Sequence, residues 1–432
     1  KNSININTKL ETVQNILPQY EGRDDAEDVK LFIKDAIEKW GIKYVLLAGG
    51  RKGQSYEWYV PSRRSNNDGS NWESGYESDL YFADIYKMVD DDIVFEDWDS
   101  NGNDIFAEWS YFSDKRDTMD YYPDVHIGRL PFRYPFEVTS VVNKIIDYEN
   151  NANDSWFKDA VVVAGDTFPP CRGAPMDHVY EGEVVTNLTA TLLEDVGFDV
   201  QRLWLSRNAW KSPEDVIPVL NQGSGFVHFA GHGNPASWGN HPPDDTEHIV
   251  YDGLSVFDMK NFENIGKLPI TVVGGCHNAQ FNVTIKNLPK IISQYGFLGS
   301  FFVDPFRFFY MEWVPRDFCS WLVVQRNGGS IASIGNTGLG YGSIGEYGDF
   351  DLDNIVEPDC LETYGGWIET RFFDAYSNQQ LSILGETHDQ AIIDYINIIG
   401  NVGAYPEVGY INDDAIGRQT IEEWTLIGDP SL

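Results

Sequence analysis

The chain has 432 residues, which is long enough for more than one hydrophobic core, and 42% of them are hydrophobic, as in globular proteins. Its 67 acidic residues against 31 basic ones give a formal net charge of -36, which repels phosphate backbones and anionic membranes. Nucleic acid is therefore excluded as an expected partner. Such an excess of carboxylates suits a protein that works outside the cell and binds divalent cations through oxygen atoms.

The sequence contains no apolar run of the roughly 20 residues that a membrane span needs, so we expect no span. The first residues, KNSININTKLETV, lack the charged and then apolar layout of a signal peptide, and we expect a processed form of a secreted protein. The four cysteines are too few for a disulfide scaffold, and if one of them stays a free thiol, at most one bridge can form. They are Cys171, Cys276, Cys319 and Cys360.

The N-terminal part of the chain predicts a small α/β unit. Apolar residues recur at helical spacing from Val29 to Trp40, which predicts a helix that begins at Asp25. The stretch KYVLLAGG predicts a buried strand that ends in glycines, and a second helix is predicted from Pro135. A polar stretch, NNANDS, comes next, so we expect a smaller N-terminal subdomain at 1–150 and a second unit at 151–432.

A calcium-loop pattern lies inside the first unit. The stretch DWDSNGNDIFAE matches the twelve-residue pattern D-x-[DN]-x-[DN]-G-x5-E, with Gly102 at the sharp turn. Its flanks do not have the two helices of an EF-hand, so we expect an embedded loop that holds a structural Ca2+. The alternative is an acidic solvated turn without a metal. The expected ligands are Asp97, Asp99, Asn101, the backbone of Asn103, and Glu108.

The second unit alternates short β-branched runs with helical segments, which predicts a mainly parallel sheet covered by helices. The predicted strands are DAVVVAGD, GFVHFAGHG, LPITVVGGC and GSIASIGNT. The predicted helices cover 180–196, 212–223, 315–326 and 387–399, and a long acidic loop is predicted at 340–357. In open sheets of this kind, ligands bind outside the carboxyl ends of the strands. We therefore expect Asp166, His232, Cys276 and Asn336 to share one edge of the sheet.

Two of these residues form a candidate catalytic pair. A cysteine attacks an amide carbonyl as a thiolate, so it needs an imidazole that takes the proton and later gives it to the leaving amine. His232 in AGHGN and Cys276 in GGCHN both follow an apolar strand and are flanked by glycines, and the N–H groups of Gly233 and Cys276 are candidate oxyanion donors. His277 is a rival base by proximity, but adjacent side chains point apart. Taken alone, each member of the pair has a plainer interpretation as a turn or packing residue.

The segments GHGNPASWG and LPITVVGGCHNAQF resemble the gingipain family of cysteine peptidases, and so do YVLLAGG, PDVHIGRLPF and the terminal GDPSL. The resemblance covers nearly the whole chain. It implies a caspase-like fold, related to that of legumains, with an N-terminal subdomain before the catalytic one. It also implies that His232 is the general base, Cys276 the nucleophile and Asp166 the acid that orients the imidazole. For Asp166, a turn cap after a strand is the alternative interpretation.

The resemblance further implies a pocket for a basic P1 side chain, the residue before the cleaved bond. The family places an acid at the start of the helix that follows, where this chain has Gly182 between Glu181 and Glu183. Either glutamate is a candidate partner for Arg or Lys, or both are first-turn residues that favour the helix dipole. Asn336 and Leu339 lie in the segment that corresponds to the opposite pocket wall, where many members have an aromatic residue in place of Leu339.

The leading hypothesis is a calcium-stabilised, secreted cysteine endopeptidase that acts on protein or peptide substrates, with a preference for basic P1. A transpeptidase of the same chemistry is an alternative, in which an amine resolves the acyl-enzyme. A non-catalytic calcium-binding surface module is the third hypothesis. The sequence predicts no organic cofactor, and His241 and His248 lack the spacing of zinc ligands. No pattern indicates an oligomeric state.

Overall fold

A computed structural model describes residues 1, 6–69, 73–110, 116–170, 178–295, 311–399 and 414–432. Cys171 lies outside the described residues. Of the other cysteines, Cys276, Cys319 and Cys360 are free thiols, and the last two are buried. None of the helices in the described ranges combines the length and the apolar character that a bilayer span requires.

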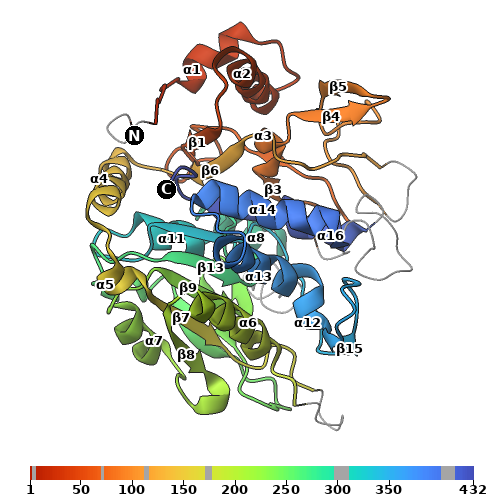
Figure 1. Cartoon of the computed structure of the whole chain (residues 1–432). Coiled ribbons are helices and arrows are strands. Elements are labelled where there is room, and N and C mark those ends of the chain that lie inside the picture. Colours follow the sequence, from red (N-terminus) through yellow and green to blue (C-terminus); the bar gives the residue numbers. More distant parts are fainter. Residues whose placement is uncertain (2–5, 70–72, 111–115, 171–177, 296–310, 400–413) are drawn as a thin grey trace.

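The core of the protein is one eight-stranded sheet, and Figure 1 labels β1 and β6 near one of its edges and β7 and β8 at the other. In spatial order its strands are β1 (Tyr44–Ala48), β6 (His126–Leu130), β17 (Trp424–Ile427), β14 (Ala332–Asn336), β13 (Ile270–Gly274), β9 (Phe226–Ala230), β7 (Asp159–Ala164) and β8 (Asp199–Trp204). Neighbouring strands run parallel except at β14 and β17, which are antiparallel. The prediction of a mainly parallel α/β sheet is confirmed.

Helices cover both faces of the sheet, as the two neighbouring residues His228 and Phe229 on β9 demonstrate. Successive side chains of a strand point to opposite faces. His228 bonds to Thr189 on α6 (Glu181–Asp195) and to Glu369 on α13 (Tyr364–Ser377), whereas Phe229 contacts Phe318 on α11 (Phe318–Val324). The layers are therefore α6 and α13 on one face, with α14 (Leu384–Asn397) packed against α13, and α11 on the other.

Most predicted elements have the expected bounds. The helix α2 covers Asp25–Trp40; the Asp24 side chain caps it by accepting from the Glu27 N–H, and Gly41 ends it with a φ of 61°. The helices α4 (Pro135–Asn151) and α7 (Pro213–Leu220) follow the predicted pattern, with Pro in the first turn of each. The helix α14 begins three residues before the predicted 387, and 340–357 is mostly irregular, as expected.

The remaining described elements are short. They are α1 (Val13–Ile16), η2 (Leu17–Gln19), β2 (Arg63–Arg64), β3 (Glu77–Ser78), α3 (Leu80–Ala83), β4 (Tyr86–Val89), β5 (Asp92–Phe95), α5 (Asp154–Phe157), η3 (Leu205–Arg207), β10 (His232–Asn234), β11 (Ser237–Asn240), β12 (Tyr251–Ser255), η4 (Met259–Asn261), α8 (Asn287–Tyr295), β15 (Tyr347–Gly348), β16 (Glu357–Pro358), α12 (Asp359–Glu362) and α16 (Ala415–Glu422).

Strands from the N-terminal and C-terminal parts of the chain are neighbours in the sheet. Strands β1 and β6 come from 1–150, and β17, from the C-terminal tail, lies between β6 and β14. Figure 1 shows β1 and β6 beside the N-terminal helices, with β7 and β8 at the opposite end of the sheet. The division of the chain into units at 1–150 and 151–432 stays a prediction.

Candidate functional site

The carboxyl ends of β9 and β13 bring the predicted catalytic pair to the same edge. The strands are parallel and in register, with Ala230 opposite Gly274, so His232 and Cys276 each follow a paired residue by two positions. Between them, the backbones are in direct contact: a Cβ added to Gly275 would lie 3.0 Å from the Gly233 nitrogen and 3.1 Å from the His232 carbonyl carbon. Glycine at 275 therefore permits the close approach of the two loops.

The ring of His232 is held by a main-chain carbonyl. Its Nε2 lies 2.7 Å from the Thr167 oxygen, and the ring stands edge to face on Phe168 with the centroids 5.7 Å apart. Because a carbonyl oxygen only accepts hydrogen bonds, Nε2 carries the hydrogen, and Nδ1 is the basic nitrogen. Burial lowers the pKa of His232. The imidazole is therefore neutral at pH 7 and able to accept a proton.

The thiol of Cys276 faces the segment after β14. Its Sγ lies 3.5 Å from the Gly340 carbonyl oxygen, and the Asn336 side chain donates to the Gly275 oxygen over 3.3 Å. Burial raises the pKa of the Cys276 thiol to about 12, and repulsion from the carboxyl groups of Glu423 and Glu73, when they are ionised, adds to the shift. In the resting protein the sulfur is therefore protonated, and a thiolate forms only when a base removes the proton.

Asp166 lies at the predicted strand end, with its carboxylate bonded to the main chain. Its Oδ2 accepts from the Asp244 N–H over 2.8 Å, and its own N–H donates to the His241 carbonyl. The next residue, Thr167, supplies the carbonyl that bonds His232. A catalytic role of Asp166 stays a prediction, and the position of its carboxylate favours an indirect one, through the shape of this turn.

The two glutamates of the predicted pocket have different partners. Glu181 is buried, and its Oε2 accepts from the N–H groups of Thr167 and Phe168 over 3.1 and 3.0 Å. Glu183 bonds to the N–H and hydroxyl of Ser206, which follows β8, two strands away from β9. Burial raises the pKa of Glu183. Glu181 therefore stabilises the turn that holds His232, and Glu183 anchors η3.

Gly182 and Leu339 occupy the places where the family pocket was expected. A Cβ on Gly182 would lie 2.6 Å from the Ala230 oxygen and 2.9 Å from the Gly165 oxygen, so the start of α6 presses on the ends of β7 and β9. A side chain at position 182 would therefore clash with these two carbonyl oxygens. Leu339 and Asn336 belong to the segment beside Cys276, and their role as a pocket wall stays a prediction.

Asn278 fixes the hairpin that follows His232, a role that the sequence did not predict. Its side-chain nitrogen donates to the carbonyls of Asn234 and Ser237 over 2.9 and 3.1 Å. A Cβ on Gly233 would lie 2.0 Å from the Asn278 Oδ1, so only glycine fits there. The Gly233 nitrogen lies close to Gly275, the residue before Cys276, and the two oxyanion donors stay predictions.

The rival base His277 is buried in a different environment. Its Nε2 lies 3.7 Å from the Glu73 Oε2, and its backbone has a φ of 57°. Burial lowers the pKa of His277 to about 4. His277 is therefore neutral over the whole neutral range, and its neighbour is a carboxylate rather than the His232 loop.

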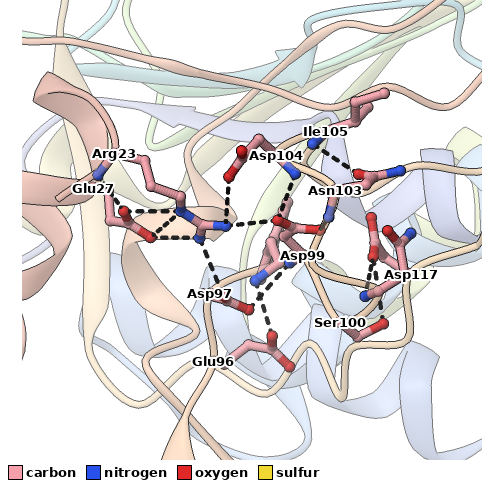
Figure 2. Close-up of polar contacts among 12 residues, drawn as sticks. Arg23, Glu27, Glu96, Asp97, Asp99, Ser100, Asn103, Asp104, Ile105 and Asp117 are labelled. Carbon is pink, nitrogen blue, oxygen red and sulfur yellow. Dashed lines mark hydrogen bonds and ion pairs between the residues drawn. The ribbon is translucent and has the colours of Figure 1, made fainter.

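An arginine from outside the acidic loop at 97–108 bonds to the predicted calcium ligands (Figure 2). Gly102 has a φ of 69°, as the sharp turn requires. The Arg23 guanidinium bonds to Asp99 over 2.6 Å and to Asp97 over 3.1 Å, and the Asn103 side chain donates to Glu108 over 2.6 Å. The oxygen donors suit Ca2+, yet two of them already bond to Arg23, which also pairs with Glu27. Calcium binding stays a prediction, and it requires the displacement of Arg23.

Replacement of Arg23 by glutamine should lower the thermal stability, because the Asp99 side chain has no exposed surface and would lose its cation. We expect a loss of about 2 kcal/mol, less than the roughly 3–5 kcal/mol for a fully buried pair, since Arg23 is 30% exposed. Added Ca2+ should raise the melting temperature of Arg23→Gln more than that of the wild type.

Thermal unfolding with EDTA or with Ca2+ measures both effects. Arg202→Gln is the control, because its pair with Glu194 lies on the surface, away from the loop. Equal stabilisation of the wild type and Arg23→Gln by Ca2+ would contradict competition between the arginine and the metal.

A second group of acidic residues lies in the loop that the sequence predicted at 340–357. Within the described residues, the carboxylates of Asp349, Asp351 and Asp353 come within 4.8 Å of one another, and Arg371 pairs with Asp351 over 3.4 Å. The D-x-D-x-D spacing is the signal that could have identified this group. It is separate from the predicted calcium ligands.

Comparison with known proteins identifies a family. The model of Peptidase family C25 matches residues 1–432. Gingipain R2 of Porphyromonas gingivalis is 25% identical over 165 residues, 38% of this chain and 20% of gingipain R2. An uncharacterized protein of Archaeoglobus fulgidus is 24% identical over 244 residues, 55% of this chain and 52% of that protein. The match thus spans only about a fifth of the length of gingipain R2.

Solved structures share the fold. The crystal structure of the Arg-specific cysteine proteinase gingipain R has a TM-score of 0.58 at 18% identity and covers 97% of this chain and 70% of its own. The complex of Porphyromonas gingivalis RgpB pro- and mature domains has a TM-score of 0.59 at 17% identity, over 98% of this chain and 72% of that one. The prediction of a caspase-like α/β fold is confirmed.

Proposed function

Because the chain belongs to peptidase family C25, we propose that it is a cysteine endopeptidase with Cys276 as the nucleophile and His232 as the general base. The register of β9 and β13 carries this proposal, since both residues follow paired positions by two and their loops touch at Gly275. Polar side chains at the ends of neighbouring parallel strands are where such sheets bind their ligands.

The proposed reaction begins with proton transfer from the Cys276 sulfur to the His232 Nδ1. The sulfur attacks the carbonyl carbon of the scissile bond, and the N–H groups of Gly233 and Cys276 stabilise the oxyanion. The imidazolium then protonates the leaving amine, which leaves a thioester. Water, deprotonated by the same imidazole, releases the acid product and restores the thiol. Since the resting thiol and imidazole are both neutral, His232 acts as a base during the attack itself.

For specificity, we propose a preference for Arg or Lys at P1. The net charge of -36 attracts cationic substrates, and the buried carboxylates of Asp166 and Glu181 lie at the turn that follows β7. Gingipain R, which shares the fold, is named for its specificity toward arginine. The same acidic composition supports secretion as the localisation, and membership of a peptidase family supports protein or peptide chains as substrates. A structural Ca2+ at 97–108 belongs to this proposal, with Arg23 as its competitor.

Fluorogenic peptides that carry Arg, Lys, Asn or Asp at P1 test the proposal. We expect cleavage after Arg or Lys to be at least about tenfold faster than after Asn or Asp, because a paired charge in a partly buried pocket contributes about 1.4 kcal/mol or more. Iodoacetamide should abolish all cleavage. Equal rates for the four peptides would contradict the specificity, and cleavage that survives complete alkylation of Cys276 would contradict the mechanism.

A further inference from the structure

The segment Gly338–Gly340 lies between the nucleophile and a pair of acidic side chains. On the side of the nucleophile, the His277 N–H donates to the Gly338 carbonyl over 2.6 Å, and the Cys276 Sγ approaches the Gly340 carbonyl at 3.5 Å. These contacts tie the segment to the residue that is proposed to react.

On the other side, two side chains bind the peptide groups of Leu339. The Leu339 N–H donates to the Glu73 Oε1 over 2.7 Å, and the Gln419 side-chain nitrogen donates to the Leu339 carbonyl over 3.1 Å. The same nitrogen lies 2.6 Å from the Glu73 Oε1 and 3.2 Å from the Glu423 Oε2. The Gln419 amide thus links the carboxyl groups of Glu73 and Glu423 to Leu339, which belongs to the predicted pocket wall.

The two carboxyl groups also pack directly on Gly338. A Cβ added to Gly338 would lie 2.5 Å from the Glu73 Oε1 and 2.6 Å from the Glu423 Oε2. No residue larger than glycine fits there without moving one of them. The three side chains Glu73, Gln419 and Glu423 therefore form a clamp, which we call the acidic clamp.

The acidic clamp carries a proton at neutral pH. Burial raises the pKa of Glu73 to about 7 and holds that of Glu423 well above its ordinary value, and the charge of Glu73 further opposes ionisation of Glu423. Of the other groups that face Glu73, Arg64 favours its ionised form, Glu312 opposes it, and His277 is neutral. The charge of Glu73 therefore changes within the range in which the protein is proposed to work.

We propose that Glu73 is a positioning residue of the active site, which holds Leu339 through the acidic clamp and, when ionised, makes the potential at the Cys276 sulfur more negative. This inference rests on the proposed function of Cys276. Ionised Glu73 disfavours the thiolate, and protonated Glu73 does not. A rise in pH through the Glu73 transition therefore makes the thiol harder to ionise, so the alkylation rate rises less steeply with pH there than for an isolated thiol.

The rate at which iodoacetamide alkylates Cys276, followed by mass spectrometry as a function of pH, tests this inference. In the wild-type protein the logarithm of the rate should bend near the pKa of Glu73, about 7. In Glu73→Gln the curve should be straight. The variant should react about 3- to 10-fold faster at about pH 8.5 and at the wild-type rate at about pH 5.5, because up to one pKa unit of repulsion is removed.

A further variant separates the charge of Glu73 from the hydrogen bonds that hold Leu339, and a second one is a control. Gln419→Ala should raise the KM for peptides without removing the bend, since it loosens Leu339 but keeps the carboxyl group. Glu214→Gln, on the exposed side of α7, is the isosteric control and should behave as the wild type. A straight wild-type curve, or a bend that persists in folded Glu73→Gln, would overturn the inference. Failure of the proposed function has a different signature, namely hydrolysis that continues after Cys276 is alkylated.

Discussion

Replacement of Cys276 by alanine should reduce peptide hydrolysis by about 10^4-fold or more, because loss of the nucleophile removes the covalent route and leaves only binding and oxyanion stabilisation. The fold should survive. The thiol makes one weak contact, 3.5 Å from the Gly340 oxygen, and its loss costs no more than about 1 kcal/mol. Rates with a fluorogenic peptide and a thermal melt of the same sample measure the two effects.

Cys319→Ala is the matched control for this substitution. Cys319 is a buried thiol on α11, and its Sγ would lie 3.0 Å from a Cβ at Gly335, so it packs against β14. The control should lose some stability and keep its rate. Wild-type rates in Cys276→Ala would contradict the catalytic proposal and favour the alternative of a binding module. An added amine nucleophile, with products identified by mass, separates hydrolysis from transpeptidation in the active protein.

The elements that could be predicted from the sequence are those with strong local signals. The helix at Asp25–Trp40 has an apolar stripe, a capping aspartate and a terminal glycine, and each is a short-range feature. The mainly apolar strands β7, β9 and β13 are buried on both faces, which predicted a parallel sheet. The carboxyl ends of adjacent parallel strands always lie at the same edge of a sheet. The sequence could therefore predict that His232 and Cys276 lie near each other.

What the sequence did not reveal depends on contacts between distant residues. The tail strand β17 lies between β6 and β14, and no periodicity in four residues predicts such an insertion. Arg23 is 74 residues from Asp97, so the calcium-loop pattern gave no sign of a guanidinium inside it. The partner of His232 is a backbone carbonyl, at Thr167, which leaves no trace in residue identity. Polar contacts of this kind require the folded structure.

Glu181 illustrates how such a contact changes an assignment. The sequence predicted that Glu181 is a candidate pocket acid. In the structure, its carboxylate accepts hydrogen bonds from the N–H groups of Thr167 and Phe168. The carbonyl of Thr167 in turn holds the imidazole. A positioning residue of this kind affects the turnover of every substrate, whereas a pocket acid affects the binding of basic substrates alone.

Glu181→Leu should therefore lower kcat about 10- to 100-fold for all peptides, because two buried N–H groups lose their acceptor, at about 1–3 kcal/mol each, and the turn under His232 loosens. Glu181→Gln keeps an oxygen acceptor and should restore most of that loss. Glu183→Gln, on the same helix and bonded to Ser206, is the control and should leave kcat unchanged. Kinetics with Arg and Asn at P1 separate the two roles. If Glu181→Gln raises KM for the Arg peptide alone, its carboxylate binds the substrate, and the positioning role is wrong.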